Sequence, residues 1–253
     1  MSNSSPRISA TIITKNEERN IRRCLESIKW VDEIIVLDSG STDKTVDICR
    51  EFTSNVFQVE WLGYGKTKQS AVDKATSPWI LSIDADEEIT PKLADVIREK
   101  VLNPGDCNGF EIKRKSQYLG KWIRHSGWNR DYPMRLFRKD SGHFNDKLVH
   151  ESVIINGKRC RIHEEMLHYT YPDLETHLRK IDKYAECWAE EKALKGKKGS
   201  LHGTFLHTVL RFIFTYFLKL GFLDGKTGLI LAMNSALSVY MKHMKLWERT
   251  RKK

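Results

Sequence analysis

The chain has 253 residues, of which 40% are hydrophobic and 30% are charged. This length corresponds to one large domain, or to one domain with an appended element. Charged residues are interspersed with apolar ones, which excludes general disorder. No apolar stretch reaches the roughly 18–20 residues that span a bilayer as a helix. Residues 1–7 hold no apolar signal core, so we do not expect a secreted protein.

The net charge of +10 is confined to one part of the chain. Residues 192–253 contain 13 basic and 2 acidic residues, whereas the first 191 residues contain 30 basic and 31 acidic ones. An enzyme that acts on nucleic acid more often spreads its basic groove through the catalytic body. We therefore expect no nucleic-acid partner.

The cysteines argue against covalent or metal cross-links. Their number is odd, they are widely spaced, and none forms a C-x-x-C pair, so we expect neither a disulfide framework nor a zinc cluster. This pattern suits a reducing cytosol. The five are Cys24, Cys49, Cys107, Cys160 and Cys187.

The first hundred residues alternate between apolar runs and helical patterns. The sequence TKNE, at residues 14–17, has the spacing of a helix-capping box. Four strand–helix units in succession predict a parallel, doubly wound sheet with helices on both faces. The expected strands are residues 7–14, 33–38, 56–60 and 79–83, and the expected helices are 21–28, 43–52, 66–75 and 91–101.

After residue 105 the alternation gives way to an α+β pattern. Strands are expected at residues 109–114, 134–138 and 149–155, and Asn156-Gly157 is a hairpin signal. A helical pattern covers residues 174–194. Beyond the break at GKKG, a mostly apolar helical tail follows.

Two acidic positions follow strands of the predicted sheet. Ligands of an open α/β sheet bind outside the carboxyl ends of its strands, where Asp38 can accept hydrogen bonds from a ribose hydroxyl or a uracil N–H. A turn or N-cap aspartate is the alternative for Asp38. Asp84 and Asp86 flank one small residue and can share Mg²⁺ or Mn²⁺, which bridges to phosphate oxygens. A solvated acidic loop is the alternative for this pair.

A third site is expected in residues 147–151 (KLVHE), where a carboxylate lies beside an imidazole. Glu151 can act there as a general base, although a charged residue on a strand face has the same pattern. His163 and His168 follow. A neutral imidazole is a good metal ligand, and a structural or solvated histidine is the alternative.

Taken together and in this order, these segments resemble family 2 of the glycosyltransferases, which has the GT-A fold. The resemblance covers residues 8–171. The KNEE start, KLVHE and the tail GFLDGKTGLILAMNSALSVYMKHMKLWE also resemble bacterial lipopolysaccharide-core heptose β-1,4-glucosyltransferases. In those enzymes UDP-glucose donates glucose to the inner-core heptose. The family segments are ISATIITKNEERNIRRCLESI for the first strand and helix, VDEIIVLDSGSTDKTVDI for nucleotide binding, GYGKTKQSAVDKA for the phosphate-side helix and WILSIDADEEI for the metal motif.

The resemblance assigns donor-binding roles to residues of the amino-terminal half. It implies that Thr14 and Glu18 lie beside the uracil and that Asp38 hydrogen-bonds the base or the ribose. Lys68 corresponds to the basic residue near the uridine and the phosphates, and Asp84 would touch the ribose or the sugar.

The resemblance also implies a divalent cation, Mg²⁺ or Mn²⁺, with Asp86 and His168 as its protein ligands. Arg135 would face the donor phosphates or an acceptor phosphate. Glu151 would be the catalytic base, taking the proton of the acceptor hydroxyl as that oxygen attacks and inverts the anomeric carbon. The cation would neutralise the charge that develops on the departing UDP.

This reading predicts an α/β GT-A fold: a Rossmann-like, mostly parallel sheet with an α+β acceptor half and a C-terminal helical tail. Residues 1–173 would form the glycosyltransferase domain, divided into a nucleotide-sugar half (1–104) and an acceptor half (105–173). Residues 174–253 would form a basic, membrane-associating helical region. The acceptor would be a lipopolysaccharide core or another lipid-linked glycan.

The tail is the basis for an expected location. Residues 212–218 (FIFTYFL) and 229–241 are apolar but short, and basic residues flank them. Such segments are typical of interfacial helices on an anionic leaflet, where each basic residue adds roughly 1 kcal/mol. Packing of these helices on the catalytic body is the alternative. We expect a cytoplasmic protein, peripheral on the inner face of the cytoplasmic membrane, that high salt or an alkaline wash releases.

Three other functions are alternatives to this one. A nucleotidyltransferase would need a Gly-rich, basic loop after the first strand, where residues 14–18 read TKNEE instead. A non-enzymatic module that binds nucleic acid through its tail is disfavoured by the apolar, aromatic character of that tail, and an RNA-shift assay at physiological salt would test it. A GT-A transferase acting on a polyprenyl phosphate, another glycan or a peptide stays open, because acceptor loops vary on this fold.

Overall fold

The computed structural model describes residues 7–145 and 152–251. The chain divides into two compact units, and each has its own buried core. The first unit comprises Met1–Arg114 and Asp131–Tyr169. The second comprises Lys115–Arg130 and Thr170–Lys253.

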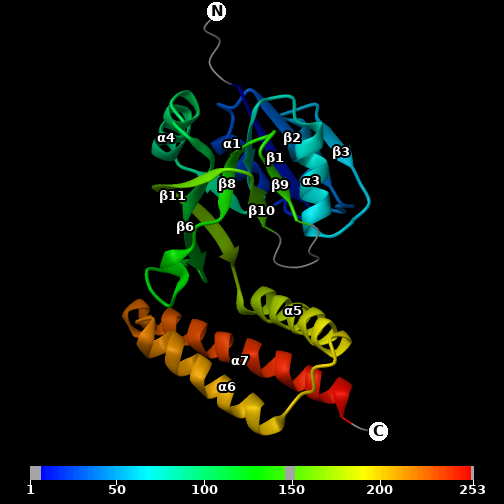
Figure 1. Cartoon of the computed structure of the whole chain (residues 1–253), viewed down its shortest axis with the longest axis vertical. Coiled ribbons are helices and arrows are strands. Elements are labelled where there is room, and N and C mark those ends of the chain that lie inside the picture. Colours follow the sequence, from blue (N-terminus) through cyan, green and yellow to red (C-terminus); the bar gives the residue numbers. More distant parts are fainter. Residues whose placement is uncertain (1–6, 146–151, 252–253) are drawn as a thin grey trace, which may run out of the picture. The chain divides into compact units, whose positions relative to one another are not determined.

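Most strands of the described residues belong to one mixed sheet, in the order β3-β2-β1-β4-β8-β6-β11-β5 (Figure 1). The first four are parallel to one another, and β8 runs antiparallel to β4 and to β6. A short antiparallel pair, β9 and β10, forms a separate sheet. The bounds are β1 (Ile8–Thr14), β2 (Glu33–Asp38), β3 (Val56–Gln58), β4 (Trp79–Ser82), β5 (Glu87–Ile89), β6 (Cys107–Tyr118), β7 (Lys121–Trp122), β8 (Met134–Arg138), β9 (Gly142–Phe144), β10 (Val153–Ile155) and β11 (Lys158–Tyr171).

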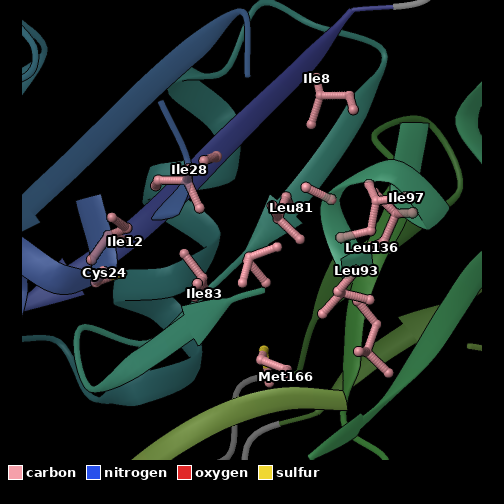
Figure 2. Packing of buried hydrophobic residues seen from close by; sticks show 14 of the residues in the cluster. Ile8, Ile12, Cys24, Ile28, Leu81, Ile83, Leu93, Ile97, Leu136 and Met166 are labelled. Carbon is pink, nitrogen blue, oxygen red and sulfur yellow. The ribbon is translucent and has the colours of Figure 1, made fainter. Parts of the chain in front are cut away.

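Helices cover both faces of the parallel strands, because successive strand residues enter opposite cores. In β2, Ile34 and Val36 belong to the core shared with α1 and α4, whereas Ile35 and Leu37 belong to the core shared with α3. Figure 2 shows the first of these cores. The helices of this unit are α1 (Ile21–Ser27), α2 (Thr45–Arg50), α3 (Tyr64–Lys74) and α4 (Pro91–Leu102).

Two local predictions in this unit are wrong. Thr14 is the last residue of β1, its hydroxyl makes no hydrogen bond in the described chain, and α1 begins only at Ile21, so no capping box forms. The Asn156-Gly157 turn does not close a hairpin, because β10 pairs with β9 while β11 joins the main sheet. An Asn-Gly pair sets a turn but not the partner strand, and burial of Val153 with Phe144 selects β9.

The prediction that the cysteines form no disulfide is wrong for one pair. Cys107 on β6 and Cys160 on β11 are bonded, with Cα atoms 5.9 Å apart. The two strands are neighbours in the sheet. The two cysteines are 53 residues apart in the sequence, so their pairing depends on the order of the strands in the sheet. The sequence did not predict the bond because it did not predict β11 as a strand.

In the second unit, α7 lies between α5 and α6 (Figure 1) and packs against both. Asp173 caps α5 by accepting from the Thr176 N–H, and Ser200 caps α6 by accepting from the Gly203 N–H. The elements are η1 (Trp128–Arg130), α5 (Leu174–Leu194), α6 (Leu201–Ile213), the π-turn η2 (Phe214–Leu218), the 3₁₀ turn η3 (Gly221–Asp224) and α7 (Gly225–Thr250).

A helix can span a membrane only if it meets requirements of length and apolarity. Among the described residues no single helix meets them. Leu201–Leu218 and Gly221–Thr250 meet them only as a pair, with a bend of 69° between the two parts.

Candidate active site

The site predicted from the sequence lies at the carboxyl edge of the parallel strands. Thr14 ends β1, Asp38 ends β2, and the two are partners in the β1–β2 register. β4 is parallel to β1 and leads into residues 84–86. The parallel directions therefore bring the predicted carboxylates to one edge of the sheet, as expected of a ligand site in an open α/β fold.

Asp38 is fully buried and holds the turn that follows it. Its carboxylate accepts the backbone N–H groups of Gly40 (3.0 Å) and Ser41 (2.9 Å) and the Ser41 hydroxyl. Gly40 has φ +86°, a conformation in which a glycine is unstrained. Asp38 therefore has the role of a turn aspartate, which was the alternative prediction for it. The turn that it holds places the backbone of residues 39–41 directly after the end of β2.

Glu18 is exposed and joins the loop after β1 to the loop after β2. Its carboxylate accepts the Lys44 N–H at 3.1 Å, and its own N–H donates to Asp43 at 3.2 Å. Asn16, at φ +56°, also crosses between these loops by accepting the Thr42 N–H at 2.8 Å. Two loops that carry predicted donor-binding residues are therefore fixed to each other.

Asp84 lies between two cations. Lys68 Nζ from α3 is 2.7 Å from Asp84 Oδ1, and the Arg135 guanidinium from β8 pairs with Oδ2. Burial would raise the pKa of Asp84, but Arg135 and Lys68 outweigh burial and hold that pKa well below its ordinary value. Asp84 is therefore an ionised hydrogen-bond acceptor at neutral pH.

Glu87 and Arg114 extend this ion network and were not singled out from the sequence. Glu87 is fully buried, 2.6 Å from Arg135 and 3.0 Å from Arg114, and it accepts the Asp84 N–H at 3.0 Å. Arg114 also pairs with Asp131 at 2.6 Å. One feature of the sequence could have indicated this network. The acidic residues of the DADEE segment, at 84–88, follow a buried strand, and buried carboxylates require cations from elsewhere in the chain.

Asp86 and His168 lie together, as predicted for a pair of metal ligands. β11 runs antiparallel to β5, and this register places His168 opposite Glu87. His168 Nε2 is 3.4 Å from Asp86 Oδ2, and the Tyr169 N–H donates to the Asp86 carbonyl at 2.9 Å. No group of three or more His, Cys, Asp or Glu side chains fit to hold a metal occurs within residues 7–145 and 152–251. The pair fits Mg²⁺ or Mn²⁺ if substrate phosphates and water complete the shell, as Mg²⁺ sites commonly require.

Several buried polar atoms of this edge make no hydrogen bond within the described chain. A buried donor or acceptor without a partner costs roughly 1–3 kcal/mol, so a ligand or water that meets these atoms is stabilising. Four of them belong to elements that build the site: Thr14 Oγ1, Ser39 Oγ, Thr67 Oγ1 and Arg135 Nε.

Glu151, the predicted base, lies outside the described residues, as do Lys147 and His150. On either side of that gap, Asn145 Nδ2 donates to the Ser152 hydroxyl at 2.7 Å. The neighbouring Phe144 donates its N–H to Gln69 of α3 at 2.9 Å, and its ring lies 5.8 Å from Lys68 Nζ. The described ends of this segment therefore lie against the helix that supplies Lys68.

Comparison with known proteins identifies the family of the chain. The Glycosyl transferase family 2 profile matches residues 9–159, and the chain belongs to that family of inverting enzymes. The predicted family and fold class are thereby confirmed.

Several relatives match over nearly the whole chain, and two of them serve as examples. The lipopolysaccharide core biosynthesis glycosyltransferase LpsC of Rhizobium meliloti is 26% identical over 250 residues, which cover 93% of each chain. An uncharacterized glycosyltransferase of Rickettsia felis is 31% identical over 263 residues, covering 96% of this chain and 90% of the relative.

Solved structures give weaker matches. TarS of S. aureus (residues 1–349) is 17% identical with a TM-score of 0.48, over 97% of this chain and 91% of its own. Glucosyl-3-phosphoglycerate synthase of Mycobacterium tuberculosis, in complex with Mn²⁺, UDP and glucosyl-3-phosphoglycerate, is 24% identical with a TM-score of 0.39, over 44% of each chain.

Proposed function

We propose that this family 2 glycosyltransferase moves glucose from UDP-glucose onto an inner-core heptose of lipopolysaccharide, with inversion at the anomeric carbon. The name of its relative LpsC, which refers to lipopolysaccharide core biosynthesis, supports the acceptor class. The resemblance of the KNEE start, KLVHE and the tail to heptose glucosyltransferases supports the sugar and the heptose.

The ion cluster at the carboxyl edge of the sheet is the observation that carries the donor half of the proposal. Arg135 and Lys68 hold an ionised Asp84 beside the end of β4. Its oxygens can accept a hydrogen bond from a hydroxyl of the ribose or the sugar there. The orphan hydroxyl of Thr14 supports uracil contact at the end of β1. Asp38 and Glu18 shape the adjoining loops and contribute to the same nucleotide site.

Asp86 and His168 would hold Mg²⁺ or Mn²⁺ together with the donor diphosphate. A cation bound there supplies positive charge next to the phosphate that leaves, which favours departure of UDP. Arg135 adds to this effect through its guanidinium, which is buried and carries one N–H without a partner among the described residues.

In the proposed transfer, Glu151 accepts the proton of the heptose hydroxyl while that oxygen forms a bond to the anomeric carbon. The bond between the anomeric carbon and the β-phosphate oxygen of UDP breaks on the opposite face, and its electron pair leaves with UDP. A positioned general base contributes about 10²–10⁴-fold to such a step.

A donor and acceptor screen tests the proposal. Purified protein is incubated with UDP-glucose, UDP-galactose or UDP-N-acetylglucosamine, and UDP release is measured with and without truncated lipopolysaccharide. Release is expected with UDP-glucose only when the acceptor carries inner-core heptose. Equal release with heptose-free lipopolysaccharide, or release that requires a polyprenyl phosphate or a peptide, would overturn the acceptor assignment. Preference for another nucleotide sugar would overturn the donor.

A further inference from the structure

The second unit exposes large apolar side chains along α6, η2 and η3. We call the exposed side chains of residues 201–223 the apolar face. Six of its members have exposed fractions between 50% and 73%: Phe205, Leu206, Leu210, Phe217, Leu218 and Leu223. Scattered exposed leucines are ordinary on a soluble protein, but contiguous patches of this kind mark binding surfaces for a partner or a membrane.

The inward side of α6 and η2 is lined by small hydroxyl residues. Thr204 and Thr215 are buried, and Thr204 and Thr208 donate their hydroxyls to the backbone carbonyls four residues earlier, at 2.7 Å. These threonines therefore meet their hydrogen-bonding needs within the helix. A water-exposed helix normally turns its large apolar residues inward, and this helix does the reverse.

Small residues also line the other side of the contact. Three of the five buried residues of α7 are small, Gly228, Ala232 and Ala236, and the other two are Leu231 and Leu246. At Gly228 a Cβ atom would come within 1.9 Å of the Gly221 carbonyl oxygen, so only glycine permits this approach of η3 to α7. Small residues between helices and large ones outward are typical of helices that face lipid.

The positive charge around the apolar face favours an anionic lipid leaflet over a second copy of the chain as its binding partner. Residues 192–223 contain Lys192, Lys195, Lys197, Lys198, Arg211 and Lys219 and no acidic residue. A second copy of this surface would bring like charges together, whereas an anionic leaflet attracts them and accepts the apolar side chains.

We propose that the apolar face is a membrane-docking surface, with α6 lying along an anionic lipid leaflet and its phenylalanine and leucine side chains in the boundary between headgroups and acyl chains. The lysines that precede α6 lie at headgroup level and select anionic lipid. The surface belongs to the second unit and serves whichever lipid-linked acceptor the enzyme uses.

Co-sedimentation of the full chain with vesicles tests the proposal. We expect binding to vesicles that contain phosphatidylglycerol and weaker binding to pure phosphatidylcholine. Leu206→Ser should lower the partition coefficient about tenfold, since full burial of a leucine is worth roughly that factor or more. The matched control is Leu102→Ser on α4, because Leu102 is 54% exposed and Leu206 is 56% exposed. The control should stay within twofold of wild type.

Charge is tested separately with Lys197→Gln/Lys198→Gln, which should bind anionic vesicles several-fold more weakly and with a smaller salt dependence than wild type. Arg50→Gln/Lys74→Gln removes two exposed charges from the first unit as the control. Circular dichroism confirms that each variant is folded. Equal binding by Leu206→Ser and Leu102→Ser would overturn the proposal. So would lipid-free dimerisation abolished by Leu206→Ser, which would make the face a contact between copies.

Discussion

Helix α4 of the first unit buries most of its large apolar side chains, whereas helix α6 of the second unit exposes most of its own. In the first unit, α4 buries Leu93 and Ile97 against the sheet. In the second, α6 buries Thr204 and exposes Phe205 and Leu206. A hydrophobic pattern with helical spacing therefore predicts a helix in both cases, but it indicates a core-facing side for α4 and not for α6.

The units also differ in how they satisfy buried polar groups. The first buries full charges in opposed pairs, among them Glu87 with Arg135. The second buries Asp224 mainly among backbone and hydroxyl donors, the N–H groups of Arg124 and His125 and the Ser126 hydroxyl, each at 3.0 Å, with the His125 ring nitrogen Nδ1 at 3.3 Å. Paired buried charges are costly to assemble and costly to break singly, which points to a ligand-binding role in the first unit and a structural one for Asp224.

The largest loss of activity is expected from Asp86→Ala. Because Asp86 and His168 are the two protein ligands proposed for the cation, removing the carboxylate should reduce transfer to background while the melting temperature stays near that of wild type. UDP release in the presence and absence of excess chelator measures the effect. Asp95→Ala, at a side chain that is 77% exposed on α4, is the control. Full activity of Asp86→Ala, or of wild type in chelator, would exclude the metal role.

Glu151→Gln is expected to lower turnover by about 10²–10⁴-fold and to leave UDP affinity unchanged. The amide keeps the shape of the side chain but cannot take the acceptor proton. Single-turnover rates and calorimetric titration with UDP separate the two effects. Glu99→Gln serves as the control, because Glu99 is an exposed side chain of α4 with no proposed part in catalysis. A rate within a few-fold of wild type would move the base to another carboxylate, with Glu164 and Glu165 the first to test.

Glu87→Gln is expected to destabilise the first unit by about 3–5 kcal/mol, the range for breaking a buried ion pair from one side. The substitution removes the negative charge between Arg135 and Arg114 and puts an amide N–H₂ against a donor. Urea unfolding of the full chain measures the loss. Glu99→Gln, at an exposed side chain of α4, should change stability by less than about 0.5 kcal/mol. Equal stability of the two variants would show that the network around Glu87 is dispensable.

Much of the first unit could be predicted because its signals are local. Buried β-branched runs gave the four parallel strands, and Pro91 marked the start of α4. β11 was missed because its buried residues, Ile162, Met166 and Thr170, recur every four positions within a charged stretch. Residues four apart do share a face of a strand, but the same-face positions between them, Glu164 and His168, are polar, so the apolar alternation that indicates a strand is absent.

The sequence predicted where the acidic site residues lie in the sheet, but not which ion pairs and which disulfide connect the strands around them. Asp84 and Asp86 follow β4 directly, so their place at the sheet edge followed from strand direction. Arg114 and Cys160 depend on which strands become neighbours across the sheet. That order is decided by tertiary packing, so nothing near either residue in the sequence indicated its partner.

The smallest expected effect concerns His177 of the second unit, which tests whether its buried polar groups are structural. His177 Nδ1 lies 2.8 Å from the Tyr118 hydroxyl, and its ring stacks on Tyr171 at 4.2 Å. Burial, with a smaller effect of Lys180, lowers the pKa of His177 from 6.5 to about 4. Because the folded state disfavours the charged form, this contribution to stability is complete above pH 6.5 and is lost as the pH falls from 6.5 towards 4.

We therefore expect the melting temperature of wild type to fall across pH 6.5 to 4 and the fall to be shallower in His177→Gln, whose amide can still hydrogen-bond Tyr118 but cannot gain a proton. The exposed His202→Gln is the control and should keep the wild-type slope. His243, whose pKa burial also lowers, contributes to the slope in all three proteins, so the difference between them isolates His177. Parallel slopes in wild type and His177→Gln would mean that the ring accepts a proton in the folded chain, and the Tyr118–His177–Asn234 cluster would then be a site that tolerates charge rather than a neutral part of the core.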